Sequence, residues 1–97
     1  MKEWLVVDGY NVINSWQDFR KFREENLEHA RELLKEKLAE YIAFKGYSGI
    51  VVFDAQEVQG VASFEKNGAL EIVFTNEGET ADSWIERRVY YLVKSGN

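Results

Sequence analysis

Cysteine is absent from the 97-residue sequence, and histidine occurs only once, at His29. Without cysteine, the chain forms no disulfide and holds no metal or redox centre through thiolates. His29 lies among glutamates in a segment of helical pattern, so we expect it on an exposed face and disfavour a mechanism that needs a histidine base. The sequence also lacks a glycine-rich phosphate loop and a serine in a nucleophile-elbow context. These absences argue against phosphate-loop NTPases and serine hydrolases.

Long apolar runs and an excess of positive charge are missing as well. No stretch reaches the length of a transmembrane helix or has the layout of a signal peptide, so we expect a cytoplasmic protein without a membrane partner. The formal net charge of −5 argues against tight, nonspecific binding of nucleic acid by a broad basic face. It leaves a nucleic-acid substrate open, because carboxylates around metal ions also make a chain acidic. The hydrophobic content of 45% is ample for the core of one small domain.

The chain does contain three apolar runs, which are typical of strands buried on both faces because they show little alternation. They comprise residues 4–7, 50–53 and 70–75. Between the first two runs, apolar residues at spacings of three and four predict a helix from the N-cap Asn26 to a stop at Gly46. A similar pattern, with Thr80 as the cap, predicts a second helix that ends near Lys94. This order of elements predicts an α/β fold with a parallel sheet.

The two remaining segments are less regular. Residues 14–25 are polar and aromatic, and we expect a loop there with at most a helical turn. In the linker before the third run, we expect a short helix at Val61–Lys66, followed by a turn at Asn67–Gly68. Three strands are too few for a doubly wound sheet, so we expect a fourth strand to follow in a longer protein.

Acidic residues stand where the predicted strands end. Asp8 and Asp54 close the first and second apolar runs, and Glu79 with Asp82 opens the helix after the third. The carboxyl ends of parallel strands share one edge of a sheet, where ligands bind in open α/β folds. Converging carboxylates need a compensating cation, and a hard cation such as Mg²⁺ prefers oxygen ligands and polarises a phosphate. A structural interpretation stays open for each acid alone, because acids at these positions also cap turns and complement helix dipoles.

Basic residues form two loose groups, one early in the chain and one in the last helix. The groups are Arg20, Lys21 and Arg23, and Arg87 with Arg88. Either group could contact a phosphate backbone, and the aromatic residues near the first could stack on bases. A solvated loop and a solvated helix face are the alternatives for the two groups. We expect the aromatic residues of the last helix, Trp84, Tyr90 and Tyr91, to be packing residues instead of a platform for bases.

Together, these motifs resemble a known family. They are Leu5-Val6-Val7-Asp8-Gly9-Tyr10-Asn11-Val12-Ile13, then Val51-Val52-Phe53-Asp54-Ala55, and finally Phe74-Thr75 with Glu79-Thr80-Ala81-Asp82. In this order and spacing they resemble the YacP-like NYN domain of the PIN-like nuclease superfamily, which includes a bacterial ribosome-associated endoribonuclease. The resemblance covers nearly the whole chain. It is specific because the Asp-Gly-Tyr-Asn motif is joined to a later Glu-Thr-Ala-Asp motif.

The resemblance implies a three-layer, Rossmann-like fold with strand order 3-2-1-4-5 and a metal-dependent endoribonuclease activity. It assigns Asp8, Asp54 and Asp82 as ligands of Mg²⁺ or Mn²⁺, and Glu79 as a further member of the catalytic cluster. Asn11 would position a carboxylate or a bound water. A metal-activated water would attack the RNA phosphodiester. The family's association with ribosomes implies mRNA under translation as a substrate and the ribosome as a partner.

The sequence departs from the family pattern at its end. Members continue into a fourth strand with a Thr-Ser-Asp-like motif that completes the acidic site, whereas this sequence stops at Gly96-Asn97. We therefore expect residues 1–97 to be a single, incomplete domain that holds only the first three strands and has impaired activity. Without a fourth strand, strand 1 becomes an exposed edge. Such edges tend to pair with another chain, so we expect a homodimer through strand 1.

Two other functions are open at this point. A non-catalytic RNA- or ribosome-binding module with the same fold would also have a partial acidic cluster. A phosphotransfer domain of the response-regulator type is disfavoured, because the lysine expected at a later strand end is not evident in the sequence.

Overall fold

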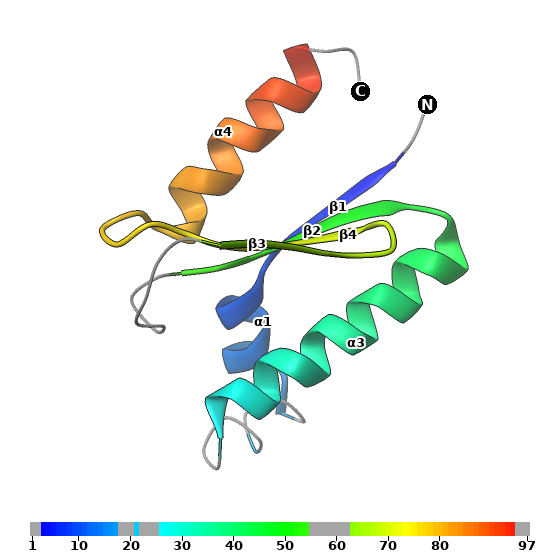
Figure 1. The fold of residues 1–97 in the computed structure, drawn as a ribbon, viewed down its shortest axis with the longest axis vertical. Coiled ribbons are helices and arrows are strands. Elements are labelled where there is room, and N and C mark those ends of the chain that lie inside the picture. Colours follow the sequence, from blue (N-terminus) through cyan, green and yellow to red (C-terminus); the bar gives the residue numbers. More distant parts are fainter. Residues whose placement is uncertain (1–2, 18–20, 22–25, 55–62, 95–97) are drawn as a thin grey trace.

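A four-stranded sheet forms the middle layer of the computed structural model, which describes residues 3–17, 21, 26–54 and 63–94. Helices α1 and α3 lie on one face of this sheet and α4 lies on the other (Figure 1). The elements, in chain order, are β1 (Trp4–Asp8), α1 (Gly9–Ser15), α3 (Leu27–Lys45), β2 (Ser48–Phe53), β3 (Ser63–Asn67), β4 (Leu70–Phe74) and α4 (Ala81–Lys94). The strands lie in the order β1-β2-β4-β3, so the chain has the three-layer α/β architecture that the sequence predicts.

The three parallel strands β1, β2 and β4 are the three apolar runs of the sequence. β2 lies in the middle and pairs in parallel with β1 on one side and β4 on the other. In the register, Asp8 lies opposite Val52, and Phe53 lies opposite Phe74. The carboxyl ends of all three strands therefore reach the same edge of the sheet. Within the described residues, β1 has β2 as its only strand neighbour and forms one side of the sheet.

Strand β3 shows that the short helix expected at Val61–Lys66 is wrong for the described part of that segment. Residues 63–67 instead pair antiparallel with β4, which adds a fourth strand to the three that were predicted. The turn that the sequence predicts here is present, because Gly68 has a φ of 61°, a conformation that glycine adopts at little cost. This turn brings residues 63–67 back alongside β4, whose backbone pairing holds them as a strand. The exposed Glu65 and Lys66 place charges on this outer strand, as is common for strands at the side of a sheet.

Helix α1 begins directly after β1, where the sequence predicts only a strand end and a loop. Asp8 has an extended backbone, and its Oδ1 atom accepts a hydrogen bond from the Asn11 N–H at 3.3 Å, as an N-cap residue does. A Cβ atom on Gly9 would lie 2.4 Å from the Phe53 ring, so only glycine allows this close approach. The helix then buries Tyr10 and Ile13. The Asp-Gly pair therefore starts a helix that packs against β2.

Helix α3 has the ends that the sequence predicts. The Asn26 side chain accepts a hydrogen bond from the His29 N–H at 3.1 Å, and Gly46 ends the helix with a φ of 73°. Its inner face buries Ala30, Leu34 and Ile42 against the sheet. The predicted crossover helix between the first two strands is therefore confirmed.

The sheet divides the core into two clusters, one on each face. Side chains of α1, α3, β2 and β4 form the larger cluster, which includes Phe53 and Leu34. The smaller cluster contains Ile50, Val52 and Val73 from the strands and Ala81 from α4. In the described part of the chain, no helix combines the length and apolar character needed to span a bilayer.

Candidate functional site

The carboxyl ends of the parallel strands bring several predicted acids to one edge of the sheet. Asp8 is the last residue of β1, and Asp54 directly follows β2. Both residues are half-buried. The chain after β4 stays close to this edge, because the Thr75 N–H donates a hydrogen bond to the Phe53 carbonyl oxygen at 3.1 Å. Elements that are distant in the sequence therefore form the edge of the sheet at which the acids were predicted to lie.

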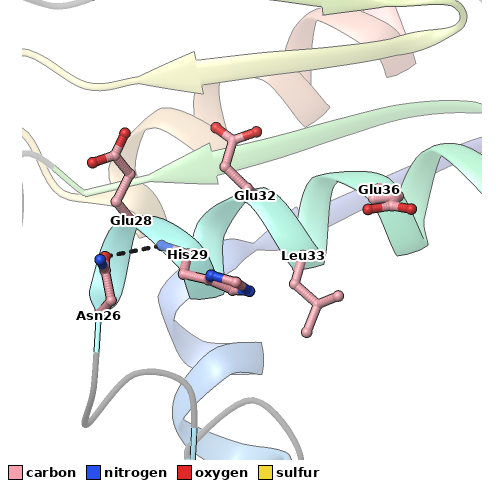
Figure 2. Close-up of a pocket in the computed structure, with 6 residues that line it drawn as sticks. All are labelled: Asn26, Glu28, His29, Glu32, Leu33 and Glu36. Atoms are coloured by element: carbon pink, nitrogen blue, oxygen red, sulfur yellow. Dashed lines mark hydrogen bonds between the residues drawn. The ribbon is translucent and has the colours of Figure 1, made fainter.

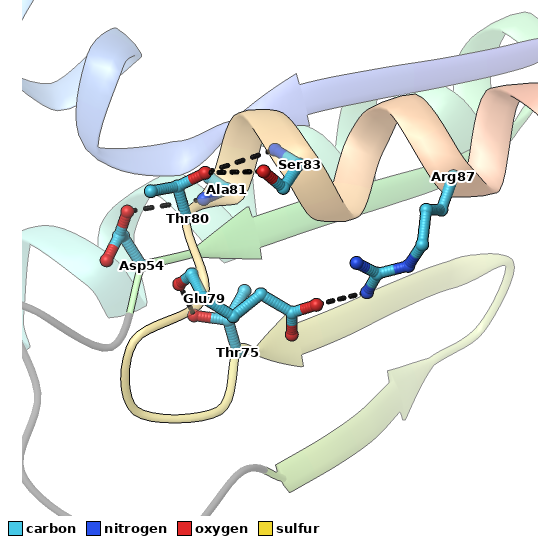
Figure 3. A network of polar contacts seen from close by, with 7 residues as sticks. All are labelled: Asp54, Thr75, Glu79, Thr80, Ala81, Ser83 and Arg87. Carbon is cyan, nitrogen blue, oxygen red and sulfur yellow. Dashed lines mark hydrogen bonds and ion pairs between the residues drawn. The ribbon is translucent and has the colours of Figure 1, made fainter.

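Asp54 connects the end of β2 to the start of α4 (Figure 3). Its Oδ2 atom accepts a hydrogen bond from the Ala81 N–H at 3.2 Å, across 27 positions of the sequence. The first N–H groups of a helix have no partner within the helix, so this contact stabilises the helix start. Thr80 contributes in the same way, because its Oγ1 atom accepts from the Ser83 N–H at 3.2 Å. Asp82 is exposed in this first turn, so Asp54 and Asp82 stand at the same helix end.

Glu79 directs its carboxylate away from Asp54, toward α4 (Figure 3). There it forms an ion pair with Arg87. Its backbone is held by two hydrogen bonds, one from its own N–H to the Asn76 carbonyl oxygen at 2.9 Å and one from the Thr75 hydroxyl to its carbonyl oxygen at 2.8 Å. Glu79 is therefore part of an ordered loop whose carboxylate already faces a cation.

Asp8 and Asn11 contact each other through the backbone of Asn11. The Asn11 N–H donates to the Asp8 carboxylate, whereas the Asn11 side-chain oxygen accepts a hydrogen bond from the Ser15 hydroxyl at 3.2 Å. The Asn11 side chain is otherwise exposed at the surface of α1. Its suggested role in positioning a carboxylate or a water stays a prediction.

The predicted metal ligands have suitable chemistry, but the structure does not gather them into a preformed centre. Carboxylate oxygens such as those of Asp8, Asp54 and Asp82 are the donors that Mg²⁺ and Mn²⁺ prefer. Among the residues that the structure describes, no three or more histidine, aspartate or glutamate side chains are grouped so that they could hold a metal ion. Asp8 and Asp54 each accept a hydrogen bond from a helix N–H. The ligand set therefore stays a prediction.

A pocket of about 290 Å³ lies beside this edge of the sheet, next to the loop that carries Glu79. The described residues that line it are Phe64, Val73, Phe74, Thr75, Asn76, Glu79 and Trp84. Sequence reasoning misses this pocket because Phe64 belongs to β3, which it does not predict. The Asn67-Gly68 pair is the signal that could have revealed it, because such a pair favours a hairpin between two strands.

Comparison with known proteins identifies the family. A family model for the YacP-like NYN domain matches residues 5–97. The chain belongs to the YacP-like NYN domain family. The matched range includes Asp8, Asp54 and Asp82, and the resemblance found in the sequence is confirmed.

Relatives of this NYN domain come from Bacillus subtilis. The chain is 43% identical over 83 residues to the uncharacterized protein YacP of strain 168, an alignment that covers 86% of the chain and 49% of that protein. A crystal structure of Rae1 (YacP) matches with a TM-score of 0.79 and 40% identity over 95% of the chain and 52% of the solved one. Its W164L mutant matches with a TM-score of 0.74 and 38% identity over 98% and 52%. The chain thus spans about half the length of these relatives.

The basic residues of this NYN domain are distributed unevenly around the site. Arg87 lies on α4 with an exposed side chain and contacts Glu79. Lys21 is exposed, whereas Arg20 and Arg23 lie outside the described residues. Arg88 contacts the sheet, because its guanidinium donates a hydrogen bond to the carboxylate of Glu71 on β4 at 2.8 Å. Arg87 is therefore the predicted nucleic-acid contact that the structure brings nearest to the acidic loop.

A second pocket of this NYN domain, of about 430 Å³, lies along the start of α3. Within the described part of the chain, it is lined by Asn26, Glu28, His29, Glu32, Leu33 and Glu36. Figure 2 shows Glu28 and Glu32 directed to one side of the helix and His29 and Leu33 to the other. All of these residues come from one helix and its cap, and His29 is exposed as the sequence predicts. The pocket at the strand ends, which combines several elements, is therefore the stronger candidate.

Proposed function

We propose that this NYN domain carries the acidic part of the active site of a metal-dependent endoribonuclease that hydrolyses phosphodiester bonds in RNA. One observation supports this function above all. Asp8, Asp54 and Asp82 lie on three separate elements that reach one edge of the sheet, in a chain that matches a nuclease-like family over residues 5–97. The chain spans about half the length of its relatives. The proposal therefore concerns the activity of a longer protein that contains this domain.

In this proposal, each acid has a defined task. Asp8, Asp54 and Asp82 would hold Mg²⁺ or Mn²⁺ through carboxylate oxygens, and the bound cation would supply charge stabilisation for the phosphodiester. Glu79 and Arg87 form an ion pair at the side of the site. The exposed Arg87 guanidinium would contact the RNA backbone, since guanidinium groups match the geometry of phosphate.

The substrate follows from the family and not from a feature of the described residues. We propose RNA in the cytoplasm, with mRNA on the ribosome as the substrate that the family's ribosome association suggests. The chain has a net charge of −5, so a ribosome or the remainder of a longer protein would supply much of the attraction for RNA.

A non-catalytic RNA- or ribosome-binding module is the second candidate. A specific observation favours it, because the described residues contain no group of three or more potential ligands placed for a metal ion. In such a module, Asp8 and Asp54 would serve only as caps for α1 and α4, the contacts that the structure already shows.

The decisive experiment is RNA cleavage with Mg²⁺ or Mn²⁺ by the chain and by its Asp8→Asn variant. Asparagine caps a helix about as well as aspartate, so α1 should persist while one proposed metal ligand is lost. We expect the cleavage rate to fall on the order of 100-fold, as it does when one group that stabilises a transition state is removed. Glu36→Gln removes an exposed carboxylate from α3 and serves as the matched control with an unchanged rate.

Thermal shift with the same metals completes the experiment, because a ligand that binds the native state raises its apparent stability. We expect Mn²⁺ to raise the Tm of the chain and of Glu36→Gln more than that of Asp8→Asn. Unchanged metal and RNA binding in Asp8→Asn, with no cleavage by either protein, would instead support the binding module.

A further inference from the structure

The pocket of about 290 Å³ beside the acidic edge is built between the β3–β4 hairpin and α4. Phe64 of β3 and Val73 of β4 are opposite each other in the register, and directly opposite residues in a sheet project to the same face. Val73 belongs to the cluster on the α4 face, against which Trp84 also packs. Phe64 and Trp84 therefore contribute aromatic surface to one pocket from two different layers.

The two aromatic side chains differ in how firmly they are held. Phe64 is 58% exposed, whereas Trp84 is half-buried. The Arg88 guanidinium lies 5.7 Å from the centre of a Trp84 ring and also donates to Glu71, which ties this part of α4 to the sheet. The Trp84 ring is thus held in place at one side of the pocket, and the Phe64 ring is accessible to a ligand at the other. An exposed aromatic ring beside a pocket is more informative than an isolated exposed residue, because the pocket leaves space for a partner.

Polar groups also line the pocket. Glu79 and Thr75 line it and also belong to the network that leads to the start of α4. Glu79 forms an ion pair with Arg87, whose side chain is 57% exposed. A guanidinium has five N–H donors, so one that contacts a carboxylate can also donate to a phosphate. Asn76 adds an exposed side-chain amide, which has both a donor and an acceptor.

We propose that this pocket binds a single unstacked base of an RNA strand, with Phe64 as the stacking residue and Arg87 as the contact to a neighbouring phosphate. The proposal rests on the nuclease function above and names the part of the substrate that the chain holds. Sequence-tolerant binding of single-stranded RNA commonly combines aromatic stacking with basic contacts to the backbone. A base in this pocket would lie next to the Glu79 loop, so its backbone would run toward the edge with Asp54 and Asp82.

The test compares two exposed phenylalanines. Phe64→Ala removes the proposed stacking ring, and Phe44→Ala removes a ring on α3 that is 85% exposed and lies outside the pocket. Binding of a fluorescently labelled single-stranded RNA is measured by anisotropy, at one fixed salt concentration and without divalent metal. Loss of one stacked base should weaken binding by about 5- to 150-fold in Phe64→Ala, whereas Phe44→Ala should bind like the unchanged chain.

Abasic RNA shows whether the effect comes from a base. Strands with one abasic nucleotide at successive positions should lose affinity at one position in the unchanged chain, and should lose none there in Phe64→Ala. Phe64→Leu keeps an apolar residue on the outer strand without a π-face, and it should bind as weakly as Phe64→Ala. Circular dichroism of all variants confirms that the fold is retained.

Several outcomes would overturn the inference. These are equal RNA affinity in Phe64→Ala and Phe44→Ala, an abasic penalty that persists in Phe64→Ala, and no RNA binding by the unchanged chain. A different set of results would contradict the proposed nuclease function and leave the base-binding pocket intact. RNA cleavage that is absent or insensitive to Asp8→Asn, together with a base effect that depends on Phe64, would leave the binding pocket in place and remove only the catalytic role.

Discussion

The two faces of the sheet are covered in different ways. On one face, α1, α3 and the strands form a cluster of nine buried residues among those described, which include Leu34 and Phe53. On the other face, the buried cluster has four residues, and Ala81 is the only fully buried residue in α4. Tyr90 and Tyr91 are 61% and 70% exposed, so the sequence-based expectation that they are packing residues is wrong. The first face is held mainly by apolar burial, and the second depends more on its polar contacts.

Those polar contacts are concentrated at the candidate site. Asp54 holds the first N–H of α4, and Arg88 connects the middle of the helix to Glu71 of β4. The Glu79–Arg87 pair joins the preceding loop to the same helix. The residues proposed for function thus also attach α4 to the sheet. We infer that stability and function are separate on the α3 face and combined on the α4 face.

The largest effect should come from removing apolar volume on the two faces. Leu34→Ala on the α3 side should lower the free energy of unfolding by about 3–5 kcal/mol, because Leu34 is 1% exposed. Ile85→Ala on the α4 side should cost less than about 2 kcal/mol, because Ile85 is only half-buried. Urea denaturation of both variants measures the two values. Equal losses would show that the two faces are packed alike.

A smaller effect is expected where α1 meets the sheet. The Cβ of Gly9→Ala would lie 2.4 Å from the Phe53 ring, so the helix or the ring must shift. We expect a loss of about 1–3 kcal/mol, typical of overpacking in a dense core. Phe53→Leu in the same chain provides the control, because a smaller side chain relieves the clash and makes the two changes less than additive. Strict additivity in urea denaturation would contradict this view of the contact.

The smallest effect should come from the caps of the two helices, and it tests the comparison most directly. Asp54→Ala removes the acceptor for Ala81 from α4, and Asn26→Ala removes the acceptor for His29 from α3. Each change should cost about 0.5–2 kcal/mol. Amide hydrogen exchange should increase along α4 in the first variant but only in the first turn of α3 in the second, because apolar packing holds the remainder of α3. Exchange confined to the first turn in both would contradict the proposed difference.

Much of the fold follows from local patterns in the sequence. Helices α3 and α4 have apolar stripes with a cap residue at the start, and the three parallel strands are apolar runs between polar segments. β3 has no such pattern, since Phe64 is the one apolar side chain among the five residues of Ser63–Asn67. Phe64, Glu65 and Lys66 are all exposed in the structure. The position of β3 depends on pairing with β4, which no periodicity within the segment can indicate. Helix α1 is hidden for a related reason, because Asp-Gly is a common turn signal as well as a helix start.

The candidate site could be predicted in position but not in orientation. Strand ends identify the edge where Asp8 and Asp54 lie, because parallel strands end on the same side. The direction of the Glu79 carboxylate depends on Arg87, eight positions later on a helix whose placement follows from the whole fold. The aromatic pocket includes Phe64 of β3, so a sequence-based prediction that misses β3 also misses the pocket. Trp84 and the strand residues Val73 and Phe74 are the lining residues whose packing role the sequence predicts.

The position of β1 has a consequence for how this domain responds to concentration. β1 pairs with β2 alone in the described part of the chain, and its last residue is Asp8. A strand that adds to its other side, from a second copy as we propose or from another part of a longer protein, would end beside a candidate catalytic acid. By mass action, assembly and the environment of that acid would then be linked. We expect metal affinity and apparent stability to rise together with protein concentration, which makes dilution as informative as mutation.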